Sequence, residues 1–115
     1  MSAKIFENIR DGNDKNAKIV FRNEDITAFQ DINPDALVHV LIIPNKTIAS
    51  LNEVVEEDSK YLSQILLGAR EIARQLGIDK TGYRLINNCG KDGGQEIDYL
   101  HFHLVGGKDV GKMLN

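Results

Sequence analysis

The stretch GGQEIDYLHFHLVGG, from Gly93 to Gly107, is the part of this 115-residue chain that decides its fold. Side chains alternate between the two faces of a β-strand, so Tyr99, His101 and His103 share one face and the apolar residues between them share the other. The two imidazoles, two residues apart, stand roughly 7 Å from each other at their Cα atoms. Both side chains can therefore reach one small group, such as a phosphate or a metal ion.

Taken alone, this pair of histidines leaves three interpretations open. They are polar side chains on the wet face of a half-buried sheet, or they bind a metal with His39 as a third ligand, since zinc takes three or four His, Cys or carboxylate ligands. In the third interpretation they are catalytic, because a neutral imidazole attacks phosphorus and a neighbouring one can hold the phosphate or the leaving group.

The segments before this strand favour chemistry at a phosphate. The loop GKDGGQE, residues 90–96, directly precedes it, and the backbone N–H groups of a glycine-rich loop can approach an anion closely. The strand before the loop ends in Asn87 and Asn88, which are neutral and do not repel a phosphate.

Composition excludes several classes of protein. The length suits one domain over residues 1–115, and a net charge of -3 without a run of Lys or Arg argues against nucleic acid or a membrane as partner. The single cysteine, Cys89, excludes an internal disulfide and a Cys-based zinc site. The N-terminus resembles no signal peptide, and no apolar run approaches the roughly 18 residues of a membrane span. We expect a cytoplasmic protein.

The hydrophobic pattern predicts an α+β fold with a mainly antiparallel sheet. Residues 2–12 form a short amphipathic helix with Ile5 and Ile9 one turn apart, and 32–35 form a turn around Pro34. Residues 47–78 are helical, with Ser50 and Glu53 spaced as a capping box. Strands are expected at residues 17–25, 26–31, 37–44, 82–88 and 98–105, the first two as a hairpin.

The long helix carries one apolar stripe, which predicts either a core face or a dimer interface. Gly77 is placed to end this helix in the left-handed conformation. The stripe consists of Leu62, Ile65, Leu66, Ala69, Ile72, Ala73 and Leu76.

Five segments in a fixed order resemble one known family: IFENI, AFQDINP, HVLIIP, GYRLINN and GGQEIDYLHFHLVGG. The last is similar to the active-site signature of the histidine triad (HIT) superfamily, His-φ-His-φ-His-φ-φ with φ apolar. Nearly the whole chain is similar to the branch called histidine triad nucleotide-binding (HINT) proteins. The chain departs from the signature at Tyr99, which stands in the place of the first histidine.

The resemblance implies a HIT-like fold: a five-stranded, mainly antiparallel sheet with one long and one short helix per subunit, in a homodimer. It implies that purine nucleoside monophosphates are ligands and that phosphoramidates, such as AMP linked to an amine, are hydrolysed through a nucleotidyl-histidine. No cofactor and no metal are implied.

The resemblance also implies roles for individual residues. His101 is the nucleophile, His103 contacts the phosphate and is our candidate general acid, and His39 backs the triad. Asp31 bonds the ribose hydroxyls, and Asn88 lies beside the phosphate. Further positions match the base-enclosing residues Phe6, Ile9, Phe29 and Leu41 and the phosphate loop Gly94, Gln95 and Glu96.

Simpler roles stay open for several of these residues. Asp31 can cap a turn, the four apolar residues can be plain core, and a buried His39 can be satisfied by a hydrogen bond to His101. Glu96 stands where several relatives have serine, and a carboxylate beside a phosphate is unfavourable unless it turns away or is protonated. We expect Tyr99 to form part of the pocket wall and to tune the proton network.

Two other functions also remain open. The first is a nucleotide sensor or scaffold with little catalysis, which the tyrosine at position 99 favours. The second is a dinucleoside polyphosphate hydrolase, which would also use His101.

One ring nitrogen of His101 attacks and the other needs a hydrogen-bond acceptor. We expect this second nitrogen to donate to a backbone carbonyl of the same strand region, because that bond fixes the tautomer.

Overall fold

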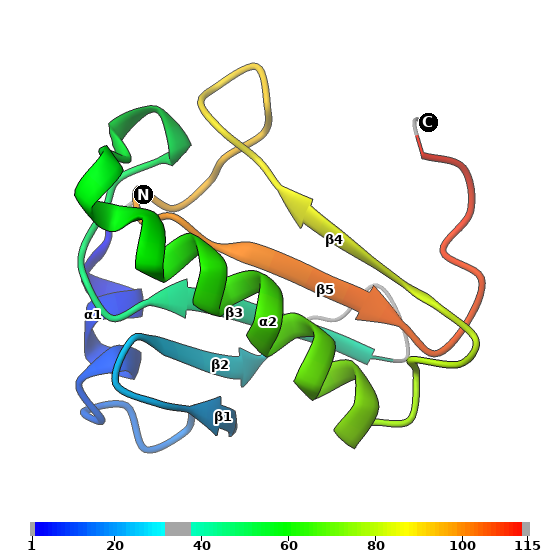
Figure 1. Ribbon diagram of the computed structural model, residues 1–115. Helices are drawn as coiled ribbons and strands as arrows, with labels where there is room; N and C mark the ends of the chain where they lie inside the picture. The colour runs from blue at the N-terminus through cyan, green and yellow to red at the C-terminus, as the bar shows by residue number, and fades with distance from the viewer. Residues whose placement is uncertain (1, 32–37, 114–115) are drawn as a thin grey trace.

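The computed structural model describes residues 2–31 and 38–113, and its centre is a five-stranded sheet in the order β1-β2-β3-β5-β4 (Figure 1). Every neighbouring pair of strands is antiparallel, which confirms the predicted sheet and its N-terminal hairpin. The strands are β1 (Ile19–Arg22), β2 (Ile26–Gln30), β3 (Val38–Pro44), β4 (Tyr83–Asn87) and β5 (Phe102–Gly106). The predicted turn at 32–35 lies outside the described residues.

The long helix α2 (Ser59–Gln75) starts later than the apolar pattern predicts. Two 3-10 turns precede it, η1 (Leu51–Glu53) and η2 (Glu56–Asp58), because the backbone between them is extended at Val54 and Val55. The hydroxyl of Ser50 accepts from the amide of Asn52 instead of joining a box with Glu53. At the other end Gly77 has φ +75°, as predicted. The amide of Ile78 reaches the carbonyl of Ala73 at 3.0 Å, which closes the last turn.

One face of the sheet is covered by α2, which packs on β1, β2 and β3 (Figure 1). The buried side chains of this layer include Ile65, Ala69 and Ile72 of the helix. Gly68 lets the helix approach closely, since a Cβ there would lie 2.6 Å from Cδ1 of Ile26. Part of the predicted stripe does not belong to the core of the subunit: Leu66 is 56% exposed, because it lies on the side of the helix turned away from the sheet.

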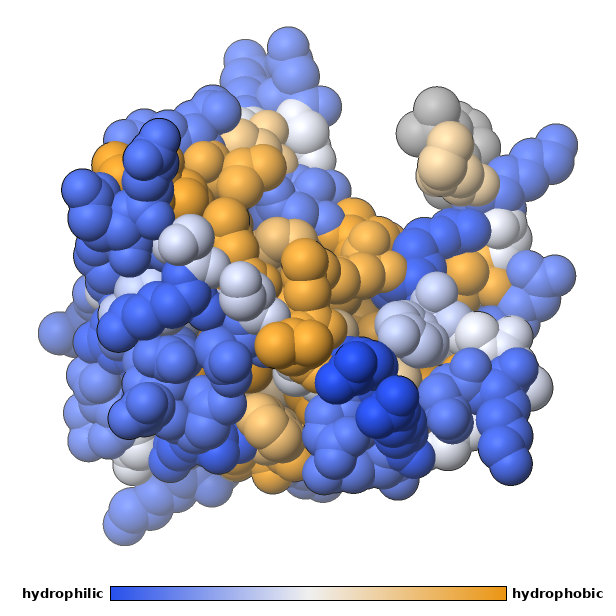
Figure 2. Space-filling model, viewed as in Figure 1, coloured by the Kyte–Doolittle hydropathy of each residue, from blue (hydrophilic) through white to orange (hydrophobic). Residues whose placement is uncertain are grey.

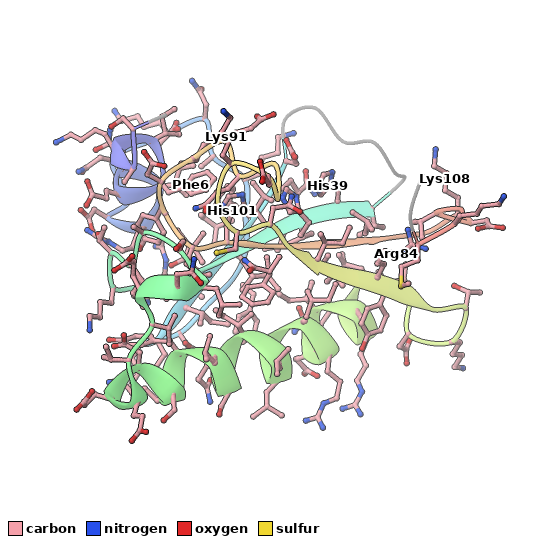
Figure 3. The ribbon with its side chains drawn as sticks, turned by 90° about the horizontal axis from the view of Figure 1, so that it is seen from above. Phe6, His39, Arg84, Lys91, His101 and Lys108 are labelled. Atoms are coloured by element: carbon pink, nitrogen blue, oxygen red, sulfur yellow. The ribbon has the colours of Figure 1, made fainter. Side chains whose placement is uncertain are left out.

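The opposite face carries the short helix α1 (Lys4–Arg10) and the loop after β4 (Figure 3). Phe6 and Ile9 are the buried residues of α1, whereas Ile5 is 47% exposed. The predicted pair Ile5 and Ile9 was therefore wrong in one member, because Phe6 faces the sheet instead. A second apolar cluster forms here from Phe6, Ile9, Phe29, Leu41, Ile43 and Tyr99.

The last strand begins at Phe102 rather than at residue 98. Tyr99 and Leu100 bond outside the sheet ladder: the amide of Leu100 donates to Ile48 at 2.6 Å, and that of Tyr99 donates to Ile97 at 2.8 Å. The chain therefore approaches β5 along the segment that follows β3. Across residues 2–31 and 38–113, no helix has the length and apolar character needed to span a bilayer.

Candidate active site

A cavity of about 660 Å³ opens on the sheet face opposite α2, within the size range of small-molecule pockets. Figure 3 shows Phe6, His39 and His101 together on this side of the sheet. The cavity brings together most of the predicted site residues, namely Phe6, Ile9, Phe29, Asp31, His39, Leu41, Asn88, Gly94, Glu96, His101 and His103. Two predicted residues, Gln95 and Tyr99, do not line it.

His101 is held by its neighbours in one orientation. Its Nδ1 lies 2.7 Å from the carbonyl oxygen of Tyr99, so Nδ1 carries the proton and donates, which confirms the predicted backbone acceptor. The side-chain amide of Asn87 donates to the carbonyl of His101 at 2.9 Å, and the ring of Phe6 meets the imidazole edge-on at 5.1 Å. Nε2 then bears the lone pair of the ring, as a nucleophile requires.

Burial also keeps this imidazole neutral. His101 is 7% exposed, and burial lowers its pKa below the usual 6.5. The bond to the Tyr99 carbonyl and the negative charges of Asp31 and Glu96 act in the opposite direction, without reversing the shift. His101 is therefore unprotonated at neutral pH.

His103, His39 and Asp31 form a connected row beside His101. Nδ1 of His103 lies 2.9 Å from Nε2 of His39, which lies 3.4 Å from the Asp31 carboxylate. The expected bond between His39 and His101 was wrong, because the strand register pairs Leu41 with His103 and so leaves His39 diagonal to His103 on the same face.

The tautomers of this row follow from one buried nitrogen. Nδ1 of His39 has no hydrogen-bond partner among the described residues. A buried N–H without a partner costs more than a buried lone pair, so His39 carries its proton on Nε2 and donates it to Nδ1 of His103. His103 consequently carries its own proton on Nε2, where it serves as a donor.

The same three residues offer the donors that the metal interpretation requires. One ligand atom each from Asp31, His39 and His103 lies within 4.8 Å of the others. Two imidazole nitrogens and one carboxylate oxygen suit zinc, and Asp31 supplies the carboxylate ligand that the histidine pattern alone did not include. His101 is not part of this set.

The other end of the cavity is apolar. Phe6 and Phe29 meet edge-on at 5.5 Å, and both line the cavity beside Ile9 and Leu41, so these residues are core and pocket wall at once. A flat aromatic ligand would find apolar surface here. The sequence analysis missed further lining residues: Ile5, Asp14, Asn16, Ala17, Gln30 and Ile97. Ile5, Gln30 and Ile97 are next to predicted site residues in the sequence, and this adjacency is the sequence feature that could have identified them.

The loop after β4 is braced by Gln95. Its side-chain amide donates to the carbonyls of Ala49 at 2.7 Å and Ile97 at 2.9 Å, and its oxygen accepts from the amide of Gly90. The predicted contact of Gln95 with a phosphate was therefore wrong for the side chain, which is occupied in holding the loop. The amides of Gly94 and Gln95 also bond within the loop.

Of the two loop residues that line the cavity, Gly94 and Glu96, Glu96 has the backbone amide that can donate to an anion. Within the described part of the chain it makes no hydrogen bond, and Glu96 lines the cavity. The Glu96 side chain is solvent-exposed, and its charge raises the pKa of His101. The residue therefore offers a neutral donor and a negative charge to the same space.

One known protein family matches most of the chain. The HIT domain family matches residues 13–110. The chain belongs to the HIT family.

Three HIT relatives match most of the chain. The purine nucleoside phosphoramidase of Escherichia coli K12 is 46% identical over 96 residues, covering 84% of this chain and 81% of that protein. A HIT family hydrolase from Legionella pneumophila has a TM-score of 0.92 and 40% identity, covering 96% of this chain and 98% of that one. A histidine triad nucleotide-binding protein from Candida albicans has a TM-score of 0.80 and 30% identity, covering 96% and 83%.

Tyr99, which the sequence analysis placed at the first histidine of the family pattern, lies behind the cavity. Its side chain is 0% exposed and packs in the cluster of Phe6 and Phe29. Its hydroxyl donates to the carbonyl of Pro44 at 2.5 Å. The expectation that Tyr99 forms part of the wall was wrong, because residues 98–101 follow the segment after β3 and turn this ring into the protein. Its backbone carbonyl still orients His101.

Proposed function

We propose that this chain hydrolyses purine nucleoside phosphoramidates through a nucleotidyl-histidine on His101. The observation that carries the proposal is the bond from Nδ1 of His101 to the Tyr99 carbonyl, which directs a neutral Nε2 for attack. The apolar end of the cavity suits a purine, and the E. coli relative, named a purine nucleoside phosphoramidase, supports this substrate class.

In the first step Nε2 of His101 forms a bond to the α-phosphorus and the P–N bond to the amine breaks. The departing amine takes a proton from Nε2 of His103. For this step His103 is protonated on both nitrogens and donates from Nδ1 to Nε2 of His39, whose own proton then lies on Nδ1.

In the second step a water molecule attacks the same phosphorus. The bond between phosphorus and His101 breaks, the water gives a proton to the now neutral His103, and the nucleoside monophosphate leaves. The amide of Glu96 and the side chain of Asn88 would stabilise charge on the phosphate oxygens in both steps.

The test is AMP release from adenosine phosphoramidate. The wild-type chain should release AMP, and His101→Ala should lose several powers of ten in rate, because the covalent route is removed. A His101→Ala variant with a rate near that of the wild type would refute the assignment of the nucleophile.

The same assay separates the other functions. Tight AMP binding without turnover would indicate a nucleotide sensor or scaffold, and faster cleavage of diadenosine polyphosphates would indicate the dinucleoside polyphosphate hydrolase. Zinc that copurifies with the protein and is lost in His39→Leu would favour the metal interpretation.

We also propose that two copies associate through β4 and the exposed side of α2. Strand β4 is at the edge of the sheet, with backbone groups open on one side, and Leu66 and Leu67 are 56% and 47% exposed. Figure 2 shows apolar residues gathered in a band across this face.

Sedimentation velocity tests the homodimer. Leu67→Glu should shift the chain to the monomer, whereas Ile19→Glu, an exposed apolar residue on edge strand β1, should leave the dimer intact. Dissociation by both variants, or by neither, would argue against this interface. The cytoplasmic location stays a prediction.

A further inference from the structure

Behind the cavity, a hydrogen-bonded network surrounds the hydroxyl of Tyr99. Nη1 of Arg10 donates to that hydroxyl at 3.3 Å and to the hydroxyl of Thr47 at 2.8 Å. The Tyr99 hydroxyl donates to the carbonyl of Pro44, and Thr47 donates to the Glu7 carboxylate at 2.7 Å. Helix α1, the segment after β3 and the segment before β5 are thus fastened together at one point.

The charges of this network determine which of its groups donate hydrogen bonds and which accept them. Burial raises the pKa of the Tyr99 hydroxyl, and Arg10 opposes that shift without reversing it, so the hydroxyl keeps its proton and donates it to Pro44. The guanidinium is itself oriented by Asp11, which accepts from Nε at 2.9 Å and from Nη2 at 3.2 Å. Arg10 is therefore a fixed donor whose other end points at Tyr99 and Thr47.

Two contacts carry this network to His101. The carbonyl of Tyr99 accepts from Nδ1 of His101 at 2.7 Å. The ring of Phe6, from the same helix as Arg10, lies 5.1 Å from the His101 ring and 6.0 Å from that of Tyr99. A shift of Tyr99 or of α1 would move the acceptor or the packing surface of the nucleophile.

We propose that Arg10 is a positioning residue for His101 and acts through Tyr99. A tyrosine hydroxyl extends beyond the ring and so reaches both Pro44 and Arg10, which turns the position held by histidine in the HIT pattern into a structural anchor. Neither Arg10 nor Tyr99 lines the cavity, so the effect falls on the orientation of the nucleophile and not on nucleotide binding. The kinetic part of this proposal rests on the proposed function.

The decisive experiment measures the tautomer of His101 by 15N NMR in Arg10→Gln and Tyr99→Phe. In the wild type we expect the Nδ1–H form, and in both variants a share of the Nε2–H form. With adenosine phosphoramidate, kcat should fall about tenfold with KM little changed, as for one hydrogen bond.

Arg22→Gln is the matched control. Nη2 of Arg22 donates to the carbonyl of Ile9 at 3.2 Å, so it also fastens α1 but does not contact Tyr99. This variant should keep the wild-type tautomer and kcat. If it reproduced the effect of Arg10→Gln, the role of Arg10 would be reduced to docking the helix.

The double variant Arg10→Gln/Tyr99→Phe tests whether the two residues influence His101 through one shared interaction or independently of each other. Because both residues act through one hydroxyl, it should lose no more kcat than either single variant. Additive losses, or an unchanged tautomer in Arg10→Gln, would overturn the proposal.

The same variants and measurements still test the proposal in two further cases. If Arg10→Gln does not fold, Arg10→Lys, which keeps the charge but cannot reach both acceptors, takes its place and should show the same Nε2–H share. If the wild type shows no turnover, the proposed function fails, and the NMR tautomers alone decide the role of Arg10.

Discussion

Replacing His39 tests whether the row of imidazoles controls proton transfer. In His39→Leu the donor to Nδ1 of His103, now at 2.9 Å, is lost, while the volume of a side chain that is only 7% exposed is roughly kept. Without that donor, nothing in the row holds the proton of His103 on Nε2, and protonation of the leaving amine should slow.

The size of the effect follows from one hydrogen bond. Leaving a buried acceptor without its donor costs about 1–3 kcal/mol. Because His103 is half-buried, water can partly replace the donor, so we take the lower part of this range, about 1.4 kcal/mol, which is about tenfold in kcat. The effect should grow with the basicity of the amine lost, since a poorer leaving group depends more on its acid.

The assay is steady-state AMP release from adenosine phosphoramidates of a graded series of amines. His39→Gln is the matched control, because its side-chain amide can still donate to His103, and it should recover most of the rate. A His39→Leu variant with wild-type kcat across the series would refute the reasoning, as would equal loss in both variants.

Four more predictions rest on the site and the core. As pH decreases, the loss of kcat/KM should occur below pH 6.5, because burial lowers the pKa of His101 and the nucleophile must be neutral. In Glu96→Gln this loss should occur at still lower pH, since the negative charge of Glu96 acts to raise the pKa of His101. A loss near about pH 7 in the wild type would contradict the assignment of His101. By the same linkage, the unfolded chain binds a proton at His101 more readily, so the free energy of unfolding should decrease as pH drops through 6.5 in the wild type but less in His101→Ala, as denaturant titrations can measure. Asp31→Ala should weaken AMP binding by about 1–3 kcal/mol in calorimetry if Asp31 bonds the ribose, and an equal loss for a ligand without ribose hydroxyls would exclude that role. Gly68→Ala should lower the free energy of unfolding by about 1–3 kcal/mol, because the added Cβ would meet Ile26 at 2.6 Å, and a thermal midpoint at or above that of the wild type would show that the helix gives way cheaply.

Short-range sequence patterns predicted much of the candidate site. Alternation placed His101 and His103 on one face, and their rings lie 5.1 Å apart. The glycine at the end of α2 and the hairpin of β1 and β2 also followed from short-range rules, because turn chemistry and side-chain period act within a few residues. The apolar residues assigned to the base were found through the family pattern and line the cavity.

The errors at His39 and Gln95 share one physical cause, which is that contacts between distant segments depend on register and loop path. His39 bonds His103 and not His101 because β3 and β5 pair Leu41 with His103. Gln95 braces the loop because Ala49 lies within its reach. Neither of these two contacts can be predicted from the residue pattern of a single segment.

The sequence by itself determined the sheet-forming segments, the pair of imidazoles and the family to which the chain belongs, since these rest on periodicity and on motifs in a fixed order. Tertiary structure alone decided what Tyr99 does. The residues before β5 lie outside the sheet ladder because the amide of Leu100 donates to the carbonyl of Ile48 and the hydroxyl of Tyr99 donates to that of Pro44. That path buries the ring, brings its hydroxyl to Arg10 and places the Tyr99 carbonyl against Nδ1 of His101, so a side chain that does not line the cavity helps to orient one that does.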